Sequence, residues 1–81
     1  MTIEQLIDYI NYGREIEFRY KGKMYSITYG TLAGKDVISF CEFYQETTEV
    51  ETPEELITVS RNGITVAEML SSIGEEDIWI Y

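Results

Sequence analysis

Residues 14–30, Arg-Glu-Ile-Glu-Phe-Arg-Tyr-Lys-Gly-Lys-Met-Tyr-Ser-Ile-Thr-Tyr-Gly, contain two runs in which apolar and polar side chains alternate. Alternation with a period of two is typical of strands that bury one face. A two-residue turn at Lys21-Gly22 pairs Phe18 with Tyr25 and puts both apolar rows on the same face. Gly22 supplies the positive φ that such a turn requires. The sequence therefore predicts a β-hairpin here.

A third strand is predicted from Asp36 to Phe43, with Tyr29 opposite Ile38 and a turn between the two strands. Its second face, which includes Val37 and Cys41, is also largely apolar, which favours a more covered, central position in the sheet. Cys41 is interpreted as a small buried hydrophobe, because the chain has no histidine to activate the thiol as a nucleophile. Residues 44–51 have weak β character and fit either a short edge strand or a loop.

Three segments have the spacing of helices. Thr2 and Gln5 are placed as a capping box for a first helix that Gly13 ends. Thr52-Pro53 begins a second, short helix, which Arg61-Asn62-Gly63 ends. Thr65 and Glu68 cap a third helix, which Gly74 ends.

A final strand, residues 78–81, is expected to lie beside the first. The chain is thus predicted to form one domain, residues 1–81, of the α+β class. Its antiparallel sheet has about four strands, with the N-terminal helix and two short helices over one face, in the order α-β-β-β-α-α-β.

Composition limits the functional classes. One cysteine and no histidine argue against a disulfide, a transition-metal site or a metal cofactor, and no other cofactor is predicted. No segment has the length of a membrane span or the pattern of a signal peptide, so a soluble, cytoplasmic protein is expected. Carboxylate pairs such as Glu15 and Glu17 lack an apolar setting, and no phosphate-binding loop or nucleophile elbow is present. We therefore expect the protein not to be an enzyme.

The net charge of −9 is unevenly distributed. Residues 1–35 contain four acidic and five basic residues, whereas residues 36–81 contain eleven acidic residues and a single base, Arg61. This excess of carboxylates disfavours direct contact with nucleic acid or an anionic membrane, and favours a basic protein as partner. The alternative is that the charge only keeps the protein in solution.

An acidic run without Lys or Arg extends from Glu42 to Glu55. Spaced carboxylates could imitate a line of phosphates and occupy a basic groove that normally holds nucleic acid, with an aromatic side chain as anchor. Glu54 and Glu55 also favour a helix N-terminus, and the whole run could instead be a solvated edge that prevents aggregation. The candidate partner-binding residues are Glu42, Tyr44, Glu46, Glu49, Glu51, Glu54 and Glu55.

The run Tyr12–Phe18, the Lys21-Gly22-Lys23 turn and the segment from Gly63 to Tyr81 resemble small, acidic, uncharacterised proteins of Firmicutes and their phages. Among phage proteins of this size and charge are the anti-CRISPR and other anti-defence inhibitors, some of which mimic nucleic acid. The resemblance implies a phage or mobile-element inhibitor whose partner is a nucleic-acid-handling complex such as a CRISPR effector. The alternative is a self-associating structural module that forms a homodimer through a strand edge.

Overall fold

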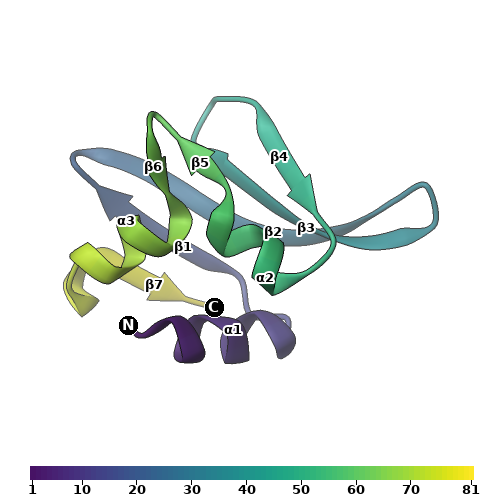
Figure 1. The fold of residues 1–81 in the computed structure, drawn as a ribbon, viewed down its shortest axis with the longest axis horizontal. Helices are drawn as coiled ribbons and strands as arrows, with labels where there is room; N and C mark the ends of the chain where they lie inside the picture. Colours follow the sequence, from purple (N-terminus) through teal and green to yellow (C-terminus); the bar gives the residue numbers. More distant parts are fainter.

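The computed structural model describes residues 1–81 and is built on a five-stranded antiparallel sheet (Figure 1). In spatial order the strands are β4 (Thr47–Val50), β3 (Lys35–Glu42), β2 (Lys23–Leu32), β1 (Ile16–Tyr20) and β7 (Ile78–Ile80). The α+β class is confirmed, and so is the position of the last strand beside the first. The sheet has five strands where about four were predicted, because residues 44–51, which fitted either a strand or a loop, contain the edge strand β4.

The predicted strand register is confirmed. Phe18 pairs with Tyr25, and Tyr29 pairs with Ile38. The β1–β2 turn has positive φ at both central residues, 49° at Lys21 and 79° at Gly22, as a tight primed turn requires. The β2–β3 turn is equally short. Because β2 and β3 are the longest strands, the hairpin that they form projects from the body of the molecule as an arm (Figure 1).

Figure 1 shows the helices together on one side of the sheet. They are α1 (Ile3–Asn11), α2 (Pro53–Thr58) and α3 (Val66–Ser72), followed by the 3₁₀ turn η1 (Glu75–Asp77). The capping boxes predicted at the start of the first and third helices are both present, and Thr52 accepts a hydrogen bond from the Glu55 amide at the start of α2. Gly13 has a φ of 71°, as expected for the residue that ends α1.

Two predicted helix ends are wrong. Asn62-Gly63 does not end α2, which stops at Thr58, but forms the turn of a small hairpin between β5 (Ser60–Arg61) and β6 (Ile64–Thr65). Both residues of this turn have positive φ, and Asn-Gly is the strongest short-range hairpin signal. The helix α3 stops at Ser72, before Gly74, because the next residue, Ile73, is already extended.

The core lies between the sheet and the helices. Phe18, Tyr25 and Phe40 stack at its centre with ring centroids 5.2–6.3 Å apart, and such pairs contribute more than their buried area alone. Every buried residue is apolar or aromatic. The set comprises Leu6, Ile10, Ile16, Phe18, Tyr25, Ile27, Ile38, Phe40, Leu56, Val66, Met69 and Leu70.

The opposite face of the sheet has no covering layer. β3 is an interior strand, as predicted, but the expectation that its second face is covered is wrong, because the helices all pack on the other side (Figure 1). Cys41 is therefore not a core residue. It is half-buried on the uncovered face, with its Sγ 3.3 Å from the Ser26 hydroxyl. No helix of the structure is both long and apolar enough to cross a bilayer.

Candidate functional site

The predicted partner-binding residues follow the free edge of the sheet. β4 pairs with β3 on one side only, so its other side is an edge. Glu42 and Tyr44 lie where the chain turns from β3 into β4, and Tyr44 is 99% exposed. Its φ of 68° belongs to this turn. The carboxylates that continue from there along β4 and into α2 are called the acidic edge below, and they are Glu46, Glu49, Glu51, Glu54 and Glu55.

The acidic edge has side chains on both sides of the sheet. Glu49 alternates with Thr48 and Val50, so it lies on the uncovered face, and Glu51 follows it at strand spacing. Alternate residues of a strand are about 6.8 Å apart. Glu54 and Glu55 lie in the first turn of α2, on the face with the helices. All five residues are exposed, so a partner can reach them.

These carboxylates are largely without basic partners. Glu51 is 3.6 Å from Lys35, and both side chains are more than half exposed, so this ion pair contributes little. Glu55 accepts a hydrogen bond from the Thr52 hydroxyl, which is a local capping contact. Glu42 lies 3.5 Å from the Asn62 amide nitrogen, at the outer limit of a hydrogen bond. The negative charge of the acidic edge is therefore available to another molecule.

Arg61 supports the acidic edge without neutralising its side chains. Its guanidinium donates to the backbone carbonyl of Glu46 at 3.2 Å and to the Thr48 hydroxyl at 3.0 Å. It also lies over the Phe40 ring, 5.7 Å from the centroid. Because Arg61 belongs to β5 and Thr48 to β4, these contacts hold the β5–β6 hairpin against β4. Arg61 binds the Glu46 backbone and not its carboxylate, so the charge of Glu46 is not neutralised. The sequence showed Arg61 as the one base of the second half, but did not reveal this role.

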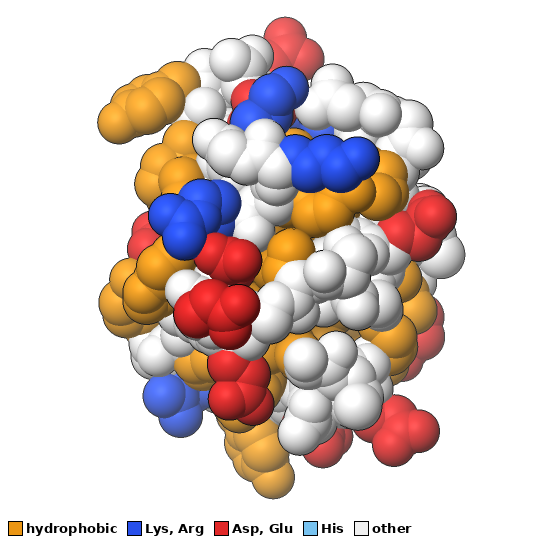
Figure 2. Space-filling view, turned by 90° about the vertical axis from the view of Figure 1, so that its left-hand side faces the viewer, with side chains coloured by type: hydrophobic (Ala, Val, Ile, Leu, Met, Phe, Trp, Pro, Cys, Tyr) orange, Lys and Arg blue, Asp and Glu red, His pale blue; other side chains and the backbone are white.

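Most basic residues lie elsewhere. Lys21 and Lys23 are at the β1–β2 turn, and Arg19 pairs with Asp77 at 2.7 Å. Figure 2 shows this end of the molecule, where Lys and Arg side chains lie beside a column of acidic ones. Charges of both signs are therefore mixed here, whereas the acidic edge has one ion pair.

Two tyrosines outside the acidic edge, Tyr29 and Tyr81, have shifted pKa values. Burial and, to a lesser degree, the charge of Glu15 raise the pKa of Tyr29 to about 12, and its hydroxyl donates to the Arg14 carbonyl at 2.7 Å. A hydrogen bond to the Glu17 carboxylate is the main cause that raises the pKa of Tyr81.

No group of three or more His, Cys, Asp or Glu side chains is arranged to hold a metal ion. Three clefts occur on the surface, the largest of about 490 Å³ at the base of the β2–β3 arm. Of the predicted site residues, only Glu51 borders this cleft. Comparisons of the chain with protein-family models, with curated proteins and with solved structures found no match.

Proposed function

We propose that the protein is a small, non-enzymatic, cytoplasmic inhibitor whose acidic edge occupies the basic, nucleic-acid-binding groove of a partner protein. The observation that carries this proposal is the row of exposed carboxylates along one edge of the sheet, with a single, exposed ion pair among them. A nucleic-acid-handling complex such as a CRISPR effector, encountered during phage infection, is the kind of partner that has such a groove.

Exposure of the carboxylates favours binding over acid–base catalysis. A general acid needs a raised pKa, which requires removal from water or a close like charge. The acidic edge is solvated and has no such setting, and its carboxylates attract a basic surface over several ångströms. Tyr44, fully exposed next to Glu46, supplies an aromatic side chain of the type that is enriched in binding hot spots.

Capture from a bacterial lysate tests the proposal. Protein fixed on beads is expected to retain a basic partner at about 50 mM salt and to release most of it at about 300 mM, because exposed charges are strongly screened. The triple variant Glu46→Lys, Glu49→Lys, Glu51→Lys should retain none. Capture that is equal at both salt concentrations, or equal for the triple variant, would refute the role of the acidic edge.

The uncovered sheet face favours a second candidate, in which two copies of the chain pack these faces together. Half-buried Met24, Val37 and Phe43 lie on this face, and Trp79 is 38% exposed at its edge. However, each copy carries a net charge of −9, so two copies repel each other. Salt therefore separates the candidates: it should strengthen a homodimer and weaken binding to a basic partner. Light scattering over a range of protein concentrations measures the first effect.

A further inference from the structure

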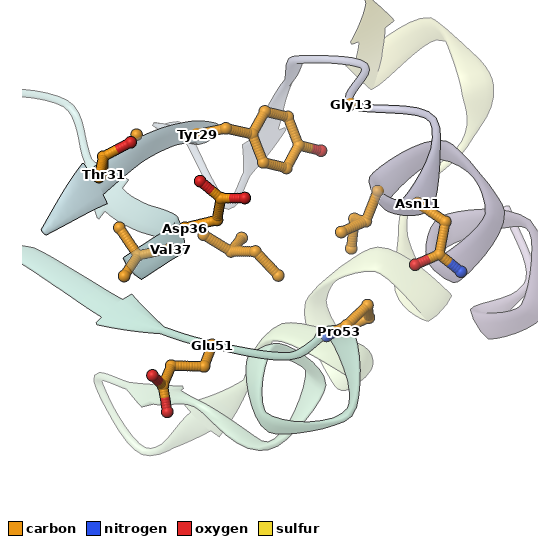
Figure 3. A pocket seen from close by; sticks show the side chains of 11 residues that line it. Asn11, Gly13, Tyr29, Thr31, Asp36, Val37, Glu51 and Pro53 are labelled. Carbon is orange, nitrogen blue, oxygen red and sulfur yellow. The ribbon is translucent and has the colours of Figure 1, made fainter. Parts of the chain in front are cut away.

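The largest cleft lies beside the acidic edge, at Glu51. It is bounded by the C-terminal end of α1, the base of the β2–β3 arm and the first residue of α2, and has a volume of about 490 Å³ (Figure 3). These three segments are far apart in the sequence. Its lining residues differ from those of the acidic edge except for Glu51.

The cleft combines an apolar floor with one directed carboxylate. Ile10, Ile38 and Pro53 supply aliphatic surface, and the ring of Tyr29 lies along one side. Figure 3 shows the Asp36 carboxylate directed into the cleft, and the Glu51 carboxylate directed away from it. Asp36 has no ion-pair partner within the chain, since the two ion pairs present are Arg19–Asp77 and Lys35–Glu51.

A second source of negative potential is the end of α1. Ile10 and Asn11 are in its last turn and line the cleft, and this turn contains no basic residue. The C-terminus of a helix carries a partial negative charge that favours a nearby cation. The two bases that neighbour lining residues in the sequence are engaged elsewhere: Arg14 donates to the Tyr81 carbonyl, and Lys35 pairs with Glu51. No Lys or Arg lines the cleft.

We propose that this cleft receives an arginine side chain of the basic partner, with its methylene groups on Ile10, Ile38 and Pro53 and its guanidinium on the Asp36 carboxylate. The inference rests on the proposed function, and it assigns a specific anchor point next to the acidic edge. An arginine suits the cleft better than a lysine, because a planar guanidinium engages a carboxylate through two parallel hydrogen bonds and stacks on aromatic rings. One inward carboxylate supplies at most two of the six to eight oxygen ligands that Ca²⁺ takes.

The environment of Tyr29 agrees with this assignment. Its phenol is neutral at physiological pH, and its pKa is raised further, first by burial and then by the negative charge of Glu15. The wall of the cleft is therefore neutral, and the local field favours positive over negative charge.

The test uses N-acetyl-arginine methylamide as the probe and ¹⁵N-labelled protein observed by NMR. We expect shifts centred on residues 10–13, 29–31 and 36–38, with a Kd of the order of 1 mM, as for a small ligand bound at one point. The Asp36→Asn variant should weaken binding at least about fivefold. Asp8→Asn removes the same charge from an exposed position on α1 outside the cleft, and should leave the Kd within about twofold.

The matching citrulline derivative keeps the shape of the probe without its charge. It is a control on the ligand, so it is measured with the wild-type protein. It should not bind measurably. Equal binding of citrulline, an unchanged Kd for Asp36→Asn, or shifts centred on residues 46–55 would overturn the cleft assignment. These outcomes do not depend on capture of a protein partner, so failure of the cleft and failure of the proposed function are distinguishable.

Discussion

Arg61 connects the stability of the fold to the geometry of the acidic edge, and Arg61→Ala is the variant that tests this connection. The substitution removes two hydrogen bonds, to the Glu46 carbonyl and the Thr48 hydroxyl, and the contact with the Phe40 ring. A hydrogen bond from an ionised donor contributes about 1.5–3 kcal/mol when shielded. Because Arg61 is only half-buried, we take about 1 kcal/mol for each bond, and about 0.5–1 kcal/mol for the ring contact.

The expected loss is therefore about 2.5–3 kcal/mol, out of a total of about 4–12 kcal/mol for a chain of this size. With an m-value of about 1 kcal/mol/M, the urea midpoint should fall by about 2.5–3 M. Arg61→Lys keeps the charge but cannot make both hydrogen bonds of the guanidinium, so its loss of stability should be about half that of Arg61→Ala.

Hydrogen exchange shows where the loss occurs. If Arg61 holds β4 in place, the amides of Thr48 and Val50 should exchange faster in Arg61→Ala, whereas those of Phe18 in β1 should change only with global stability. A midpoint within about 0.5 M of the wild type, or equal acceleration of exchange in β1 and β4, would refute the positioning role of this residue.

Further predictions concern the core and the raised pKa of Tyr29. Ile27→Ala removes three carbons from a fully buried position and should cost about 3–4 kcal/mol in chemical denaturation, whereas Ile27→Val should cost about 1 kcal/mol. A loss below about 1 kcal/mol for Ile27→Ala would contradict the packing described here. Tyr29 has a pKa of about 12 in the folded state against 10.0 for an unperturbed tyrosine. The stabilisation of the fold by protonated Tyr29 is thus complete below pH 10 and is lost between about pH 10 and 12. The difference in Tm between the wild type and Tyr29→Phe should shrink over this range, and a constant difference would be inconsistent with the raised pKa.

The part of the fold that the sequence predicted depends on local signals. The β1–β2 register followed from alternation and from Gly22, and the capping boxes followed from pairs such as Thr65 and Glu68. Each of these signals acts within a few residues, so it can be read without knowing the partner element.

The errors arose where pairing is not local or where two readings compete. β4 consists of Thr, Glu and Val residues without a clear period, and it becomes a strand by pairing with β3. Asn62-Gly63 was interpreted as a helix end, although it carries the strongest hairpin signal in the chain. The apolar residues of the uncovered face suggested a second covering layer, but the helices pack on one side only.

The candidate site shows the same division. The acidic edge could be identified by counting charges along the sequence, because its residues are close together in the chain. The cleft could not, because Ile10, Tyr29, Asp36 and Pro53 come from four separate elements that meet only in the folded protein. Asp36 had appeared in the sequence merely as the start of a strand.

The most direct test of the central claim is the affinity of the captured partner for two variants of equal charge. Glu46→Lys, Glu49→Lys, Glu51→Lys and the control Glu4→Lys, Asp8→Lys, Glu75→Lys both change the net charge from −9 to −3. The control residues are exposed and lie on α1 and η1, outside the acidic edge.

If the acidic edge is the binding surface, the first variant should weaken binding about 100-fold or more in a calorimetric titration, at roughly 1 kcal/mol for each reversed carboxylate, and the control by about threefold or less. Equal losses in the two variants would contradict this account, because they would show that net charge, and not the position of the charge on the acidic edge, determines binding.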